Sequence, residues 1–350
     1  MARSRVQRVN VSKVLWIVAG LFVFILALQL AKSGAGSAAP FVRDTLDVSN
    51  AANALGFGWL FAYIVLSGSP VAAVALALLS SGTIDEIQTF AMIAGSRLGA
   101  SFVVLLLGGL YVLRGHERRA GLAIGLMALT VTASIYLPAL AVGYVVLKYE
   151  WLDGLQFEFT VFDIVNTAYE PLVEPLVDFL PGFGVFALGV AFIVAAFNMI
   201  DRGLPEINLE ERGIENVSQL LYRPEVMFAI GLVVTLVSLS VSVSLGILVP
   251  LSARGLIRRE NLIPYIMGCN ISTFIDTLVV AALLQSPQGF TVVLVEMLSV
   301  ALVSALVLAT AFNSYERGVV WLVDWALERN RNSAIFLAAL FLVPLALMVF

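Results

Sequence analysis

Two short serine-containing segments interrupt long apolar stretches of this sequence. Residues 66–69 read LSGS and residues 239–242 read LSVS, so each segment has serines at its second and fourth positions. A serine hydroxyl can donate a hydrogen bond to an oxyanion, and its oxygen lone pairs can also bind a hard cation. Each segment would therefore suit the binding of a small ion or of a hydrogen-bonding solute. The alternative is that these small residues let neighbouring helices pack closely.

Three ionisable residues, Arg97, Asp276 and Glu296, also fall inside apolar stretches. Counted along helices from the nearest polar end, each lies about 12 to 17 Å below the same surface. Intramembrane charges usually face a partner or a water-filled path. In one interpretation Arg97 and Asp276 form a structural ion pair while Glu296 reaches an interface. In the other, the carboxylate left without a partner carries a proton, or Arg97 binds an anionic substrate or replaces a cation.

The composition identifies the chain as an integral membrane protein. Apolar residues make up 60% of its 350 residues, charged residues make up 13%, and the mean hydropathy is +0.98. A bilayer core of about 30 Å requires about 20 apolar residues per helical crossing. The clearest apolar runs are residues 14–30, 122–146, 183–199, 224–240, 291–311 and 335–350. The alternating pattern of a membrane β-barrel is absent, so we predict an all-α polytopic fold.

The distribution of basic residues predicts the orientation in the plasma membrane, because short cytoplasmic loops accumulate Lys and Arg. One side receives Arg3, Arg5, Arg8, Lys13, Arg114, Arg118, Arg119, Arg202, Arg212, Arg223, Arg254, Arg258, Arg259, Arg317, Arg329 and Arg331. The other side receives Lys32, Arg43 and Lys148 together with an acidic connection at residues 149–180. We therefore expect a cytoplasmic N-terminus and an extracytoplasmic C-terminus. Trp321 and Trp325 predict a short interfacial helix before the last span.

The first apolar run has a second interpretation as a secretory signal. Arginines precede residues 14–30, and the small-residue segment SGAGSAAP follows them. The run is longer than the roughly 7 to 15 apolar residues of a signal sequence, so a retained membrane helix is the expectation.

The two serine segments belong to a longer internal repeat. Residues 66–104 align without a gap on residues 239–277, at a constant offset of 173. The matched pairs are Leu66 with Leu239, Ser67 with Ser240, Ser69 with Ser242, Gly82 with Gly255, Ile84 with Ile257, Ile93 with Ile266, and Gly95 with Gly268. We interpret this pattern as a duplication.

Each repeat is predicted to contain a re-entrant hairpin. If it is helical, the piece at residues 70–80 is about 16 Å long, which is half a bilayer. Non-helical backbone at membrane depth is tolerated where it lines a cavity, so the LSxS tips should meet at one near the midplane. Three crossings separate the two halves, which makes the second half inverted.

This interpretation divides the chain into four parts. The first repeat covers residues 1–148, and the extracytoplasmic connection covers residues 149–180. The inverted second repeat covers residues 181–313, followed by an interfacial helix and a last transmembrane helix at residues 314–350.

These segments resemble the type II sodium-phosphate cotransporter family, in which each inverted half has a QSSS motif and then a GANIGTT-like segment. The resemblance covers about residues 50–110 and 225–290. It implies phosphate held between the two tips by serine hydroxyls and helix N-termini, with sodium ions close by. The substrate-binding residues it implies are Ser67, Gly68, Ser69, Ser240, Val241, Ser242, Arg97, Asn270, Ser101 and Thr273.

The chain departs from the family pattern at both tips and in the segment that follows each tip. Leu66 and Leu239 replace the glutamines, and Gly68 and Val241 replace the middle serines. The family asparagine is retained as Asn270 but is Arg97 in the first half, and the paired threonines become Ala100, Ser101, Thr273 and Phe274. Two oxygen ligands for sodium are thus missing, and Arg97 adds a permanent positive charge beside the expected sodium site.

These observations favour a secondary transporter of phosphate or a related oxyanion. Coupling is to sodium or protons, with Asp276 and Glu296 as ion-coupling candidates and Glu296 as the preferred proton carrier. No cofactor is expected beyond a transported Na⁺ or H⁺. The partners expected are membrane lipid and a small anionic solute, with no nucleic acid and with homodimer formation left open.

Two other function classes were weighed. An enzyme is disfavoured because the single histidine, His116, lies in a charged stretch, and no GxSxG or phosphate-binding glycine loop is present. The single cysteine, Cys269, excludes an intramolecular disulfide. The remaining alternative is a non-transporting scaffold that kept the transporter fold after losing both glutamines.

Overall fold

The computed structural model describes residues 11–42, 48–113, 115, 118–152, 163–204, 223–246, 248 and 259–349. All regular secondary structure within these ranges is helical. The elements are α1 (Val11–Pro40), α2 (Ala51–Val65), α3 (Ser69–Ser80), α4 (Glu86–Ala100), α5 (Phe102–Leu113), α6 (Arg118–Lys148), α7 (Asp163–Phe179), α8 (Gly182–Gly203), α9 (Pro224–Ser238), α10 (Val241–Gly246), the 3-10 turn η6 (Arg259–Asn261), α12 (Leu262–Ser272), α13 (Phe274–Leu283), α14 (Pro287–Leu306), the π-helical turn η7 (Val307–Ala311), α15 (Phe312–Glu328) and α16 (Asn330–Val349).

The described part of the chain contains seven helical segments that are long and apolar enough to cross a membrane. They are Val11–Pro40, Glu86–Leu113, Leu122–Lys148, Gly182–Gly203, Arg259–Leu283, Pro287–Glu328 and Asn330–Val349. The prediction of a helical, multi-pass membrane protein is confirmed at this level. Three further apolar helices, α2, α3 and α9, are shorter than a full crossing.

The predicted span at residues 224–240 is wrong. Helix α9 begins at Pro224 and ends at Ser238, so its 15 residues extend for about 22 Å. Leu239 then adopts a left-handed conformation with φ of 49°. This conformation cannot continue a right-handed helix, and it occurs at the LSVS segment, where the sequence predicts a break.

The first break has the same backbone geometry. Helix α2 also has 15 residues, and it ends at Leu66 with φ of 57°. Leu66 and Leu239 are 173 residues apart, as are the first residues of α2 and α9. A left-handed leucine costs about 1 to 2 kcal/mol, so the surrounding packing must impose this conformation at both positions.

The helix pair α2/α4 and the helix pair α9/α12 pack through equivalent glycine contacts. The close contacts are Gly58 with Met92 and Gly95 with Leu55 in the first pair, and Gly231 with Tyr265 and Gly268 with Phe228 in the second. A Cβ atom at any of these glycines would lie 2.1 or 2.2 Å from the facing carbonyl oxygen. Each contact in one pair maps onto its counterpart in the other by the offset of 173.

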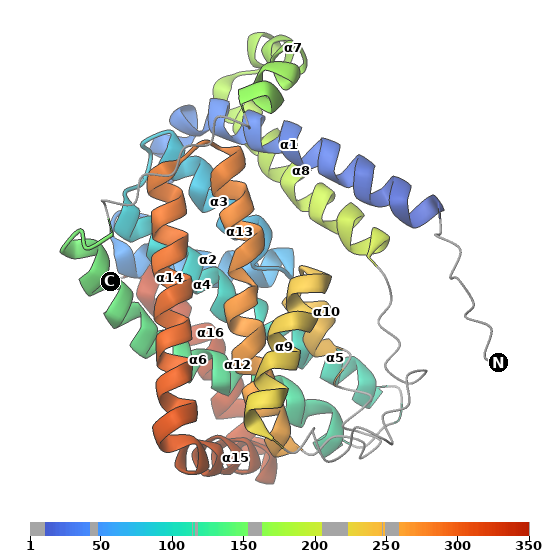
Figure 1. The fold of residues 1–350 in the computed structure, drawn as a ribbon, viewed down its shortest axis with the longest axis vertical. Helices are drawn as coiled ribbons and strands as arrows, with labels where there is room; N and C mark the ends of the chain where they lie inside the picture. Colours follow the sequence, from blue (N-terminus) through green and yellow to red (C-terminus); the bar gives the residue numbers. More distant parts are fainter. Residues whose placement is uncertain are drawn as a thin grey trace.

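Helices α1 and α8 form an antiparallel pair that extends away from the main bundle (Figure 1). Gly34 faces the backbone of Phe186, and Gly189 faces the backbone of Ala31, at distances that exclude a side chain. Helix α1 continues to Pro40, well beyond the predicted run at residues 14–30. The SGAGSAAP segment is therefore helical, because its small residues fit against α8.

The lower end of the bundle is closed by α15, which lies across the end of α14 (Figure 1). The π-helical turn η7 makes this bend. Trp321 on α15 is 66% exposed, and Asp324 accepts a hydrogen bond from Arg259 at 3.2 Å. Trp321 and Trp325 thus lie on a separate helix that directly precedes α16, and the membrane interface as its location stays a prediction.

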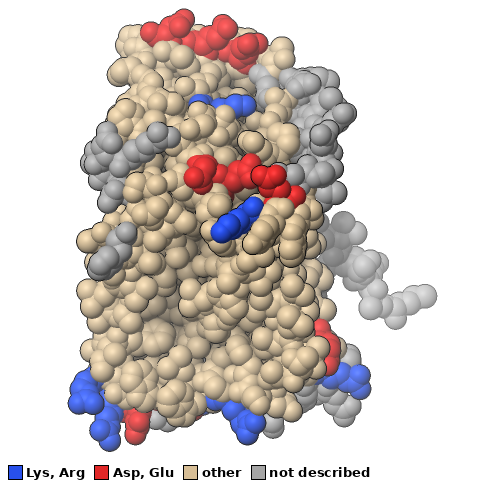
Figure 2. All heavy atoms as spheres, turned by 90° about the vertical axis from the view of Figure 1, so that its left-hand side faces the viewer, with Lys and Arg blue, Asp and Glu red and all other residues tan. Residues whose placement is uncertain are grey.

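Charged side chains are unevenly distributed along the molecule. Figure 2 shows acidic groups at the upper end, a second group of acidic and basic side chains between the upper end and the middle, a band below it with almost no charge, and mainly Lys and Arg at the lower end. Helix α7 lies at the upper end (Figure 1) and exposes Glu170, Glu174 and Asp178. An uncharged band with Lys and Arg gathered at one edge is typical of the surface of a membrane-embedded bundle.

Candidate functional site

Both breaks line one small cavity of about 20 Å³. A water molecule needs roughly 10 to 15 Å³ by the same measure, so the space admits about one. The lining residues are Ser67, Gly68, Ser69, Arg97, Ala100, Ser101, Tyr136, Phe197, Asp201, Leu239, Ser240, Val241, Asn270 and Thr273. The structure therefore brings together nine of the ten residues predicted to bind substrate. The tenth, Ser242, has a side chain outside the described set.

The first break is held against α4 by close backbone packing. A Cβ atom on Gly68 would lie 2.8 Å from the carbonyl oxygen of Ser96, so the tip requires glycine at this position. Helix α3 begins at Ser69, immediately after it, with Pro70 in the first turn. The first-turn N–H groups of α3 are therefore close to the cavity that Ser67 and Ser69 line.

The second break is held by hydroxyl hydrogen bonds. The Val243 N–H donates to Ser240 Oγ at 3.3 Å, so this hydroxyl caps the start of α10. Thr235 Oγ1 of α9 donates to Ser244 Oγ at 2.8 Å. Helix α10 thus folds back along α9, and the two helices lie side by side in Figure 1.

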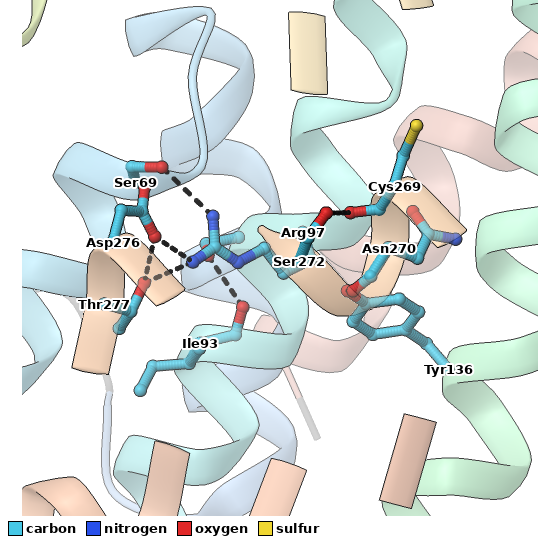
Figure 3. Close-up of polar contacts among 10 residues, drawn as sticks. Ser69, Ile93, Arg97, Tyr136, Cys269, Asn270, Ser272, Asp276 and Thr277 are labelled. Carbon is cyan, nitrogen blue, oxygen red and sulfur yellow. Dashed lines mark hydrogen bonds and ion pairs between the residues drawn. The ribbon is translucent and has the colours of Figure 1, made fainter. Parts of the chain in front are cut away.

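Arg97 connects the first break to α13 (Figure 3). Its Nη1 donates to Ser69 Oγ at 3.2 Å, and its Nη2 lies 3.4 Å from Asp276 Oδ1 and also donates to Thr277. The guanidinium carbon lies 5.2 Å from the centre of the Phe274 ring. The Arg97 side chain is 4% exposed, and its Nε has no hydrogen-bond partner among the described residues. Arg97 is thus a buried cation with one donor free.

The ion pair predicted between Arg97 and Asp276 is present, but Glu296 takes no part in it. Glu296 lies on α14, is 2% exposed, and has no hydrogen-bond partner for either carboxyl oxygen among the described residues. It is buried in the bundle and does not reach an interface. Arg97 lies close enough for its charge to act on Glu296. Asp276 Oδ2 also has no partner within the described chain.

Asn270 occupies the position that corresponds to Arg97 in the second half. Its amide exchanges hydrogen bonds with the Thr132 hydroxyl, at 3.2 and 3.4 Å. Its backbone carbonyl accepts a hydrogen bond from the Tyr136 hydroxyl at 3.0 Å (Figure 3). The two halves therefore contribute a charged side chain and a neutral one to the same cavity.

Ser101 and Thr273 lie where helices restart beside the cavity. The Ser101 hydroxyl donates to the carbonyl of Leu98 at 2.7 Å, so its hydrogen is already used within α4. Thr273 separates α12 from α13, and its N–H donates to Cys269 O at 3.1 Å. Both residues can still offer hydroxyl lone pairs to an occupant.

Ala100 and Leu239 of the repeat motifs line the cavity without having been predicted to bind substrate, and the sequence interpretation missed Tyr136, Phe197 and Asp201 altogether. Asp201 and Arg202 follow the apolar run at residues 183–199 and look like the polar end of a span. Helix α8 instead brings this end to the cavity. No local signal separates these two situations, because the difference lies in the placement of α8 relative to α3 and α10.

The guanidinium of Arg97 is already compensated by a carboxylate. Asp276 pairs with it, Asp201 lines the same cavity, and Glu296 is buried nearby. An anion that enters the cavity must therefore compete with Asp276 for Arg97, or use the free Nε and the serine hydroxyls.

The chain was compared with known families, curated proteins and solved structures. No family model, no curated protein and no solved structure matches it.

Proposed function

We propose that this protein is a secondary active transporter of a small solute, with phosphate or a related oxyanion as the substrate class. The observation that carries the proposal is the shared cavity, because two helix breaks 173 residues apart line it together with the buried cation Arg97. Broken helices that meet at a repeat interface are the binding-site architecture of many secondary transporters.

The proposed architecture is an inverted duplication with a re-entrant hairpin in each half. Helices α2 and α9 support it through their equal lengths and matched left-handed ends. The glycine contacts give independent support, because α2 packs against α4 in the same way as α9 packs against α12. The antiparallel arrangement of α1 and α8 also fits an inversion, since these helices begin the first and second repeats.

The chemistry proposed for the site uses donors from both halves. Arg97 offers charge, the cavity-lining serines offer hydroxyls, and the first turn of the 12-residue helix α3 offers N–H groups. A tetrahedral oxyanion has five heavy atoms and exceeds a cavity that admits about one water. Binding therefore requires the two tips to separate, as in a movement that opens the site to one side of the membrane.

The proposed location is the plasma membrane, with the N-terminus cytoplasmic and the C-terminus extracytoplasmic. Lys and Arg predominate at the lower end in Figure 2, and this excess supports the orientation through the positive-inside rule. Coupling to sodium or to protons is part of the proposal, with Asp276 and Glu296 as the ion-coupling residues.

A non-transporting membrane scaffold is the second candidate. One observation favours it: Leu66 and Leu239, at the family's glutamine positions, are 47% and 45% exposed and add no polar group to the tips. Arg97 is in addition compensated by Asp276 without any ligand.

Counterflow of radiolabelled phosphate in proteoliposomes separates these two functions. The purified protein should exchange internal for external phosphate, and the double variant Ser67→Ala with Ser240→Ala should abolish exchange while remaining folded. The matched control is Ser33→Ala with Ser314→Ala, which changes two exposed serines outside the cavity. Exchange that the double variant retains would place the site elsewhere, and no exchange of phosphate or sulfate by the unaltered protein would favour the scaffold.

A further inference from the structure

The buried carboxyl group of Glu296 has no role in the contacts described so far. Helix α14 packs against α6, α13, α4, α12 and α3. The ionisable groups that interact electrostatically with Glu296 from these helices are Arg97 on α4 and Tyr136 on α6, and Asp276 on α13 acts on both of them. Arg97 already pairs with Asp276, and Tyr136 already donates to the carbonyl of Asn270. Within the described chain, no donor bonds to Glu296.

An ionised carboxylate is poorly suited to this position. Both oxygens are buried and receive no hydrogen bond in the described chain, so nothing there replaces the hydration that the charge would lose. The nearby Arg97 attracts a negative charge, but its own charge is largely compensated at 3.4 Å by Asp276. A neutral carboxylic acid loses far less hydration on burial. The conformation described here is therefore one in which Glu296 holds a proton.

We infer that Glu296 is the proton-binding site of the transport cycle, occluded in this conformation and exposed when the two tips separate. This inference rests on the proposed function and selects the proton among the coupling ions. When water reaches Glu296, the carboxyl group releases its proton to that water, and the carboxylate is then stabilised by hydration and by Arg97. No other bond forms or breaks in this step.

The protonation state of Glu296 also sets the charge that an incoming anion meets. Arg97 and Asp276 cancel, so the group of Arg97, Asp276 and Glu296 is neutral when Glu296 is protonated and carries one negative charge when it is not, in addition to the carboxyl of Asp201 that lines the cavity. A negative group repels an oxyanion at the neighbouring cavity. Proton binding should therefore strengthen anion binding, and anion binding should strengthen proton binding by the same factor. This reciprocity is the thermodynamic basis of a proton–anion symporter.

A sodium ion is disfavoured at the same place. Asp276 is already paired with Arg97, so within this group only the carboxylate of Glu296 is left to bind a cation. A single carboxylate binds a proton through one O–H bond, whereas a hard metal cation needs several oxygen ligands.

The first test asks whether Glu296 is protonated, and it does not depend on transport. Infrared difference spectra of the reconstituted protein should contain the carbonyl band of a protonated carboxylic acid near neutral pH. Glu296→Gln should remove that band, whereas Glu225→Gln should keep it because Glu225 is exposed at the start of α9. A band of equal intensity in Glu296→Gln, or no band in the unaltered protein, would overturn the inference.

The second test asks whether that proton is coupled to transport. Phosphate uptake into proteoliposomes should follow an imposed pH gradient, and Glu296→Gln should lose pH-driven accumulation. Glu296→Asp should restore part of that accumulation because it restores a titratable carboxyl. Uptake that follows a sodium gradient, ignores pH and is normal in Glu296→Gln would overturn the inference. Absence of counterflow in the unaltered protein would instead contradict the proposed function, so the two failures are distinguishable.

Discussion

The helix pairs α2/α4 and α9/α12 share a framework but differ in the chemistry that they bring to the cavity. Their glycine contacts and left-handed leucines correspond at an offset of 173. The residue that projects toward the cavity is Arg97 in the first pair and Asn270 in the second. Backbone packing thus fixes where each helix breaks, independently of the polar residue presented there. A site of this kind can change its charge without changing its fold.

The two pairs also differ in how their breaks are held. Ser244 in the second half hydrogen-bonds to Thr235 and Tyr265 and lies 3.3 Å from the Cys269 sulfur. The corresponding residues in the first half are Val71, Ala62, Met92 and Ser96, so apolar packing replaces most of this network. The first break gains its polar anchor from Arg97 and Ser69 instead. One half is anchored by charge and the other by neutral hydroxyls.

The largest expected effect distinguishes the charged half from the neutral half. Arg97→Met leaves Asp276 buried without its cation and should cost about 3 to 5 kcal/mol of unfolding free energy. Asn270→Leu removes neutral hydrogen bonds and should cost about 1 to 3 kcal/mol. Denaturant unfolding in detergent micelles measures both. The double variant Arg97→Met with Asp276→Asn should recover much of the loss, and a double variant as unstable as Arg97→Met alone would contradict the assigned pair.

The next effect tests the shared framework. Gly95→Ala and Gly268→Ala each place a methyl group 2.1 Å from a carbonyl oxygen and should destabilise the protein by about 1 to 3 kcal/mol each. Because the contacts are equivalent, the two losses should be similar. Gly109→Ala is the control, since its Cβ meets nothing within 4 Å. Thermal unfolding measures the three variants, and a loss confined to one of the two contact glycines would show that the frameworks are not equivalent.

A smaller effect concerns the hydroxyl network of the second break. Ser244→Ala should loosen α10 by about 1 kcal/mol, which corresponds to a roughly fivefold increase in local opening. Cys269 is the only cysteine of the chain and is buried beside Ser244, so its reaction rate with a maleimide reports this opening. Ser314→Ala on α15 serves as the control. Equal labelling rates would mean that apolar contacts alone hold the second break.

The smallest effect comes from an exposed ion pair. Arg259 and Asp324 lie 3.2 Å apart, with side chains 37% and 47% exposed. Solvent screens such a pair, so Asp324→Asn should change the unfolding free energy by less than about 1 kcal/mol. Comparison of this variant with Arg97→Met shows how much more an ion pair contributes to the unfolding free energy when it is buried. A loss as large as that of Arg97→Met would show that the lower end of the bundle depends on this contact.

Composition and local pattern determined the membrane class and several features of the fold. The apolar fraction and the length of the runs were sufficient to predict a helical multi-pass protein, because a bilayer imposes a minimum length on every crossing. The LSxS segments marked both helix breaks. The alignment at an offset of 173 paired Gly95 with Gly268, and these two glycines make equivalent helix contacts. Counting residues along helices also placed Arg97 and Asp276 at one depth, since each residue adds a fixed rise of about 1.5 Å.

Only the tertiary structure decided which of these groups meet. The rise per residue of a helix fixes the depth of a side chain in the membrane. It does not fix the direction in which the side chain points, because that direction depends on how the helices pack. Packing pairs Arg97 with Asp276 and leaves Glu296 without a partner in the described chain. It also brings Asp201 to the cavity, although the sequence around it resembles the polar end of a span. The LSVS segment predicts that α9 stops near Ser238, but only the structure shows that Leu239 is left-handed there, beside α12 and α10.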